Sequence, residues 1–175
     1  MLVDVGTGSG CLAVSLALAL PTARVLAIDA SADALLVARV NMAQHGVGSR
    51  ISCFHGDLLT AIAQEGVANQ MEVIVSNPPY ISDGDIGTLQ PEVRDFEPRL
   101  ALAGGCDGME LHRRLLTQAP AYLKPGGALL MEVGLGQAAA VCRQAEEYGQ
   151  FCTYAVLQDQ GGIDRVRFAD FTEIR

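Results

Sequence analysis

The chain has 175 residues, half of them apolar and 18% charged, with a formal net charge of −8. This length is typical of one domain with a sizeable buried core, and the composition excludes a disordered chain. The acidic balance argues against a direct nucleic-acid partner, because such proteins need a basic stripe. The residues Arg113, Arg114 and Lys124 are instead scattered between acidic and apolar segments.

The spacing of the cysteines and histidines argues against a metal site and a disulfide. The five cysteines are odd in number and include no C-x-x-C pair, and the three histidines lack metal-ligand spacing. We therefore expect neither a metal nor a disulfide.

The opening MLVDVG has no charged signal region, and the apolar run CLAVSLALAL (11–20) is too short to span a membrane. We expect a cytoplasmic protein with no membrane partner.

The predicted elements alternate between strands and helices. Ser31 is the expected N-cap of a helix that ends near Gln44, with Gly46 as its stop, and Asp107 and Glu110 are expected to cap a later helix. In chain order we expect a strand at 2–5, a helix at 9–19, strands at 24–29, 50–57 and 71–76, a polar loop at 81–107, a helix from 107, a turn at 123–127, a strand at 128–133 and a helix at 137–148.

Alternation of this kind predicts a mostly parallel, doubly wound sheet with right-handed crossovers. The last two apolar runs, FCTYAVL and RVRFA, are separated only by the polar loop QDQGGID. We therefore expect them to form an antiparallel hairpin at one edge of the sheet. Residues 1–175 are expected to form one domain.

A glycine-rich turn, DVGTGSG (4–10), follows the first predicted strand. Glycines at alternate positions let the backbone approach a ligand closely. Cys11 stands where the dinucleotide fingerprint needs its third glycine, whereas G-x-G-x-G is the spacing of a loop that binds S-adenosylmethionine (SAM). Free N–H groups at the predicted helix start, Ser9, can bind the cofactor's carboxylate. The alternative is a plain tight turn. The predicted cofactor residues here are Gly6, Thr7, Gly8, Ser9 and Gly10.

Two carboxylates end the next predicted strands. Asp29 can accept hydrogen bonds from both ribose hydroxyls of the cofactor. Asp57 can accept the adenine amino group, with Leu58 in apolar contact with the ring. The alternative for Asp29 is an N-cap or a solvated carboxylate before Ser31. The alternative for Asp57 is a cap of the following short helix, and its two roles are nearly balanced.

A rigid corner, SNPPYI (76–81), ends the fourth predicted strand. Consecutive prolines cannot continue a sheet. The side-chain oxygen of Asn77 and the carbonyl of Pro78 can accept the two N–H hydrogens of a planar amide or amine. Pro79 adds rigidity, and Tyr80 can pack on the planar group. The fourth strand is expected beside the first, so these four residues are the predicted catalytic residues, and Asn77 is also predicted to contact the cofactor. The alternative is a turn with two prolines.

Several segments together resemble the release-factor glutamine N5-methyltransferases, a class I SAM-dependent family. They are VDVGTGSG, IVSNPPYI, PEVRDFEPRLALAGGCDGMELHRRLL, LKPGGALLMEVGLGQ and GGIDRV, and the resemblance covers nearly the whole chain. It implies a Rossmann-like class I methyltransferase fold, SAM as cofactor and S-adenosylhomocysteine as product. The implied substrate is the glutamine of the Gly-Gly-Gln motif in peptide chain release factors, held by Asn77 to Tyr80. Implied cofactor contacts are Gly6 to Gly10, Asp29, Asn77 and the residue after Asp57.

The chain also departs from this family. The N-terminal helical domain and the segment before the first strand are absent, and Leu58 stands where some members have an aromatic residue. We therefore expect a catalytic domain with weakened substrate docking. Two other functions stay open. A nucleic-acid methyltransferase acting on adenine or guanine would need a basic groove, and a SAM-binding module without activity would not need an intact Asn77 and Tyr80.

Overall fold

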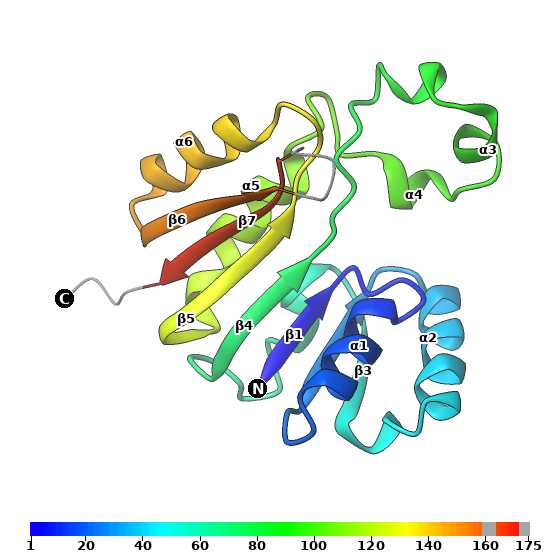
Figure 1. Cartoon of the computed structure of the whole chain (residues 1–175), viewed down its shortest axis with the longest axis vertical. Coiled ribbons are helices and arrows are strands. Elements are labelled where there is room, and N and C mark those ends of the chain that lie inside the picture. Colours follow the sequence, from blue (N-terminus) through cyan, green and yellow to red (C-terminus); the bar gives the residue numbers. More distant parts are fainter. Residues whose placement is uncertain (159–163, 172–175) are drawn as a thin grey trace.

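The computed structural model describes residues 1–158 and 164–171. Its sheet has the order β3-β2-β1-β4-β5-β7-β6 (Figure 1). The first five strands in this order are parallel, and β7 is antiparallel to both β5 and β6. The predicted parallel sheet with an antiparallel edge hairpin is confirmed. The strands are β1 (Leu2–Val5), β2 (Val25–Asp29), β3 (Ile51–His55), β4 (Met71–Ser76), β5 (Leu123–Glu132), β6 (Phe151–Gln158) and β7 (Asp164–Phe171).

Helices cover both faces of this sheet. All four residues of β1 are buried, and its side chains alternate between two apolar clusters. Leu2 belongs to the cluster with α1 and α2, whereas Val3 and Val5 belong to the cluster with α5 and α6. The longer helices are α1 (Cys11–Ala19), α2 (Ala32–Gln44), α5 (Glu110–Gln118) and α6 (Ala138–Tyr148), and the short ones are η1 (Gly48–Arg50), η2 (Leu58–Ile62), η3 (Ile86–Thr88), α3 (Pro91–Arg94), α4 (Arg99–Leu102) and η4 (Ala119–Ala121).

The ends of α1 and α2 follow from local sequence. Ser31 caps α2 as predicted, because its Oγ accepts the Ala34 N–H at 3.2 Å. Helix α1 begins at Cys11, two residues later than predicted, because Gly10 adopts a left-handed conformation (φ 81°) that no helix can include. A Cβ at Gly10 would lie 3.1 Å from the Cβ of Ala38, so this glycine lets the two helices approach each other.

Three predicted elements need correction. The polar loop at 81–107 contains η3, α3 and α4, which are too short to show helical periodicity. Asp107 and Glu110 do not form the predicted capping pair. The N-cap of α5 is Met109, and Asp107 accepts that residue's N–H at 3.1 Å. The predicted turn at 123–127 lies inside β5, where extra residues bulge between the pairs Met71–Leu123 and Val73–Ala128.

Two further observations concern the described residues only. None of their helices has the length and apolar character that a membrane span requires. Likewise, among these residues no group of three or more His, Cys, Asp or Glu side chains is arranged to hold a metal ion. Most of the QDQGGID loop, residues 159–163, lies outside the described residues.

Candidate functional site

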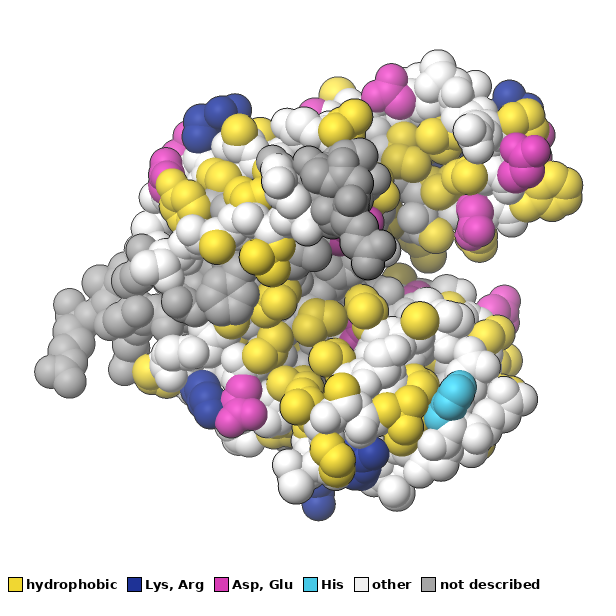
Figure 2. Space-filling view, in the orientation of Figure 1, with side chains coloured by type: hydrophobic (Ala, Val, Ile, Leu, Met, Phe, Trp, Pro, Cys, Tyr) yellow, Lys and Arg dark blue, Asp and Glu magenta, His cyan; other side chains and the backbone are white. Residues whose placement is uncertain are grey.

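A cavity of about 620 Å³ lies at the carboxyl ends of the first four parallel strands. This is the edge at which open α/β sheets bind ligands, and the volume is typical of a small-molecule site. The cap segment (residues 82–104), which carries α3 and α4, stands apart from the sheet (Figure 1), and Figure 2 shows a hollow between it and the part formed by α1 and α2. Predicted site residues that line the cavity are Gly6, Gly8, Ser9, Asp29, Asp57, Leu58, Asn77, Pro78 and Pro79.

The glycine turn presents its backbone to the cavity. Gly6 and Gly8 have positive φ angles of 72° and 55°, which favour glycine. A Cβ at Gly8 would meet no atom within 4 Å, so the space beside it is open. Thr7 and Gly10, also predicted as cofactor residues, do not line the cavity. Thr7 is buried and supports the turn from behind.

Asp4 organises this turn, a role that was not predicted for it from sequence. Its Oδ2 accepts the Thr7 hydroxyl at 2.6 Å and the Ala13 N–H at 3.0 Å. The side chain is fully buried, and burial raises the pKa of its carboxyl group. The available signal was its place at the head of the glycine stretch, in an otherwise apolar strand.

Asp29, the last residue of β2, binds the glycine turn and the start of α2. Its Oδ2 accepts the Gly8 N–H at 2.7 Å, and its Oδ1 accepts the Ser31 N–H at 2.8 Å. The helix-cap alternative for Asp29 is wrong, because the N-cap of α2 is Ser31, and at this helix start Asp29 binds only the N–H of that capping residue. A carboxylate offers about four acceptor positions. The half-buried Asp29, which lines the cavity, therefore keeps capacity for a ligand's hydroxyl groups.

Asp57 is placed differently from the prediction. Strand β3 ends at His55, so Asp57 lies two residues beyond it, at the N-cap position of η2 but without a side-chain capping bond. Its carboxylate pairs with Arg114 of α5, and 62% of its side chain is exposed. The next residue, Leu58, adopts a left-handed φ of 48°, which is unusual for a residue other than glycine. Such strain is typical of ligand sites.

The proline corner faces the glycine turn across the cavity. Strands β1 and β4 pair directly, as predicted, and the Ser76 Oγ donates to the Val5 carbonyl at 2.8 Å. A Cβ at Gly6 would lie 4.0 Å from the Asn77 carbonyl oxygen. Asn77 is exposed and lines the cavity together with Pro78 and Pro79. The turn and the corner are therefore neighbours.

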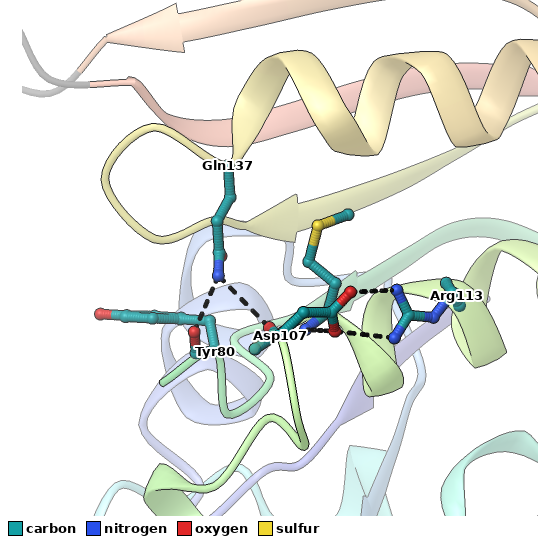
Figure 3. A network of polar contacts seen from close by, with 6 residues as sticks. Tyr80, Asp107, Arg113 and Gln137 are labelled. Carbon is teal, nitrogen blue, oxygen red and sulfur yellow. Dashed lines mark hydrogen bonds and ion pairs between the residues drawn. The ribbon is translucent and has the colours of Figure 1, made fainter. Parts of the chain in front are cut away.

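Tyr80 lies behind the corner and does not line the cavity. Its hydroxyl donates to Glu132 Oε1 at 3.5 Å. Its backbone carbonyl accepts the Gln137 side-chain amide at 2.8 Å (Figure 3). Beside it, Arg113 pairs with Asp107 through two bonds of 2.8 Å and lowers the pKa of that carboxyl group to about 2.

The cap segment is closed at its base. Ile81 and Ala103 form a parallel bridge, in which the Ile81 N–H donates to the Leu102 carbonyl at 3.1 Å and the Gly104 N–H donates to the Ile81 carbonyl at 2.8 Å. Arg99 pairs with Asp83 at 3.2 Å. The cavity residues of this segment and of α5 were not predicted from sequence. They include Glu97, Pro98, Leu100, Ala101, Glu110, Leu111 and Arg114.

The charges around the cavity favour a cationic ligand. Four carboxylates, those of Asp29, Asp57, Glu97 and Glu110, line it, whereas Arg114 is the cation among its described lining residues and is already paired. A positively charged centre in this space would be attracted by the excess of carboxylates. Apolar side chains such as Leu58 complete the walls.

The sequence matches known proteins over most of its length. Residues 1–91 match the model of the family described as methyltransferase small domain. The chain is 45% identical over 163 residues to the release factor glutamine methyltransferase of Geobacter sulfurreducens, covering 93% of this chain and 55% of that protein. It is 49% identical over 131 residues to the ribosomal protein uL3 glutamine methyltransferase of Bordetella pertussis, covering 75% of this chain and 42% of that one. The chain thus spans about half the length of these relatives.

Solved structures share the fold. A methyltransferase from Pyrococcus furiosus superposes with a TM-score of 0.69 at 17% identity, covering 99% of this chain and 75% of that one. The N-terminal domain of human METTL16, in complex with SAH, superposes with the same TM-score and identity. This match covers 99% of this chain and 61% of that one. The fold is therefore the Rossmann-like one of class I methyltransferases, as expected.

Proposed function

The chain belongs to the methyltransferase small domain family, and from this membership we propose that it methylates the side-chain amide nitrogen (N5) of a protein glutamine, with SAM as methyl donor. One observation carries the proposal. The Asn77-Pro78-Pro79 corner and the Gly6–Gly8 turn line the same cavity, and they follow two strands that pair directly with each other, β4 and β1. A methyl donor on the turn and a planar amide at the corner would therefore meet. Residues 1–175 would act as the catalytic domain.

The cavity fits SAM by size, charge and backbone shape. Gly8 leaves open space for the methionine part of the cofactor, and Asp29 lies where ribose hydroxyls would reach its carboxylate. Leu58 and Leu111 provide apolar walls for the adenine. Asp57 is proposed at the adenine amino group, where it would bond the base while keeping Arg114 as its partner. The excess of carboxylates suits a sulfonium cation.

The corner would orient the amide. The Asn77 side-chain oxygen and the Pro78 carbonyl accept the two N–H hydrogens, which fixes the nitrogen in line for attack and raises its electron density. When bound, SAM supplies a methyl group on positively charged sulfur, so that the N–C bond forms as the S–C bond breaks, and the surplus amide proton leaves to water. Tyr80 acts from behind the corner, through its backbone and its contact with Glu132.

A peptide chain release factor is the proposed protein substrate. The name of the Geobacter sulfurreducens relative and its coverage of 93% of this chain support this choice. The name of the Bordetella pertussis relative supports ribosomal protein uL3 as a second candidate, over 75% of this chain. Both substrates present a glutamine amide, so the chemistry at the corner is the same.

The test is the mass of candidate substrates after incubation with the protein and SAM. We expect a gain of one methyl group on the glutamine of a Gly-Gly-Gln release factor, and none when that glutamine is replaced by glutamate. Parallel reactions contain uL3 and an oligonucleotide with adenine and guanine. Methylation of the oligonucleotide alone would replace the proposal by a nucleic-acid methyltransferase. SAM binding without methylation of any substrate would leave a binding module.

A further inference from the structure

We infer that Gln137 is a positioning residue for methyl transfer, which fixes the amide-binding corner by holding the backbone carbonyl of Tyr80. The inference rests on the proposed function, since it concerns the geometry of the same corner. Gln137 is not among the residues that line the cavity. Its effect would pass through Tyr80, three residues after Asn77.

The Gln137 amide joins three separate segments. Its Nε2 donates to the Tyr80 carbonyl at 2.8 Å and to the Gly108 carbonyl at 3.4 Å. Its Oε1 accepts the Gly134 N–H at 2.9 Å. One side chain at the start of α6 therefore connects the turn after β5, the proline corner and the end of the loop that returns from the cap segment (Figure 3).

Glycines leave the space that this connection needs. A Cβ at Gly108 would clash with the Tyr80 carbonyl oxygen and would lie 2.7 Å from Gln137 Nε2. A Cβ at Gly134 would lie 2.8 Å from Gln137 Oε1 and 3.0 Å from Tyr80 Cδ2. Any side chain at either position would push the amide or the tyrosine away. Three segments thus meet closely at one carbonyl group.

This contact has a direct consequence for the reacting amide. The prolines restrict the backbone at positions 78 and 79, so the corner moves as a rigid unit, and the direction of the Pro78 carbonyl depends on how this unit is held, including at its far end. The far end is the Tyr80 carbonyl that Gln137 binds. The N–H of the same peptide group, that of Ile81, donates to the Leu102 carbonyl, so without the Gln137 bond this group would be held on one side only. A misplacement of the corner by about 1 Å can cost about a hundredfold in rate.

The test compares Gln137→Glu with wild type. This change keeps an oxygen to accept the Gly134 N–H but replaces the donor to Tyr80 and Gly108 by a carboxylate oxygen, which repels both carbonyls. Gln70→Glu is the matched control, because Gln70 Nε2 donates to the Gly66 carbonyl at 2.8 Å at an exposed site away from the cavity. The measurements are kcat and KM with a Gly-Gly-Gln substrate, SAM affinity by calorimetry, and hydrogen exchange of the segments 80–82 and 104–108.

We expect Gln137→Glu to lower kcat by about tenfold to a hundredfold, with unchanged SAM affinity and faster exchange in both segments. Gln70→Glu should match wild type in all measurements. The inference is overturned if Gln137→Glu keeps the wild-type kcat and the wild-type hydrogen exchange. It is also overturned if SAM affinity falls as much as kcat, because the substitution would then have disturbed the whole site and not the corner alone. If wild type methylates no glutamine substrate, the proposed function fails, and the exchange measurement alone decides whether Gln137 holds the corner.

Discussion

Asp29 holds its carboxylate between the glycine turn and the start of α2, and cofactor affinity should depend on it strongly. Asp29→Ala is expected to weaken SAM binding by about 1.5–3 kcal/mol, the scale of hydrogen bonds to a charged group. Asp33→Ala, which removes an exposed carboxylate outside the cavity lining, is the matched control. Calorimetry measures both. Equal affinities for wild type and Asp29→Ala would remove Asp29 from the site.

Replacement of Asn77 should slow methyl transfer much more than it weakens SAM binding, because the proposed partner of Asn77 is the reacting amide. Asn77→Ala is expected to lower single-turnover methylation by about 10²–10³, the usual effect of removing one preorganised hydrogen-bond partner. SAM affinity should change far less. Near-normal single-turnover rates in the variant would contradict the proposed role of the corner.

His112 should make the free energy of unfolding depend on pH. It is fully buried, its Nε2 lies 2.8 Å from the Glu132 carbonyl, and burial lowers its pKa. In the unfolded chain His112 binds a proton with the ordinary histidine pKa of about 6.5. In the folded chain its pKa is lower, so the proton binds only at lower pH. The stabilising effect is therefore complete above the unfolded pKa and is lost as pH falls below it, until the folded pKa is reached.

Urea unfolding of wild type and His112→Gln at about pH 7.5 and about pH 5.5 tests this expectation. Wild type should lose stability relative to the variant by up to about 1.4 kcal/mol per pH unit within the window. His45→Gln, at an exposed position, is the control. Parallel pH dependences of wild type and His112→Gln would show that His112 does not contribute.

The contact between α1 and α2 depends on Gly10, which meets both Ala38 and Met42. Gly10→Ala should destabilise the fold by about 1–3 kcal/mol, because the added methyl overpacks this contact. Gly46→Ala is the matched control for backbone strain. Gly46 has a similar φ of 68°, but an added Cβ would meet nothing within 4 Å. Urea unfolding compares them, and equal losses of stability would show that only the strained backbone matters.

Strong local signals made most elements predictable from sequence. The run Met71–Ser76 was predicted with its observed bounds, because a mostly apolar run is followed, after Asn77, by two prolines. Helices α3 and α4 were not predicted, since four residues cannot show a helical period. The bulge in β5 was mistaken for a turn because Pro and Gly signal both structures, and only the pairing with β4 distinguishes them.

Residues of the candidate site could be predicted from sequence where one continuous segment carries the recognisable pattern. The glycine turn, Asp29 and the proline corner carry their chemistry in local sequence and line one cavity. Arg114 and Gln137 were missed, because their importance comes from partners 57 residues away in sequence. No local pattern in α5 or at the start of α6 indicates such partners.

A ligand in the cavity should connect the sheet to the cap segment, since both line it. S-adenosylhomocysteine at a hundred times its Kd should stabilise the protein by about 2.7 kcal/mol. It should also slow hydrogen exchange in residues 97–104. The control ligand is adenosine alone, which lacks the methionine part expected beside Gly8. Unchanged exchange in the cap segment would place the ligand against the sheet only.

The Ser76–Val5 hydrogen bond has a consequence for how the protein acquires its site. It joins residues 71 positions apart, and the pairing of β1 with β4 spans the same distance. A nascent chain that ends before Met71 can hold β1, β2 and β3 but lacks the proline corner. Closing such a long loop is slow compared with forming local contacts. The two sides of the candidate site, the glycine turn after β1 and the proline corner after β4, are therefore brought together only when these distant segments meet.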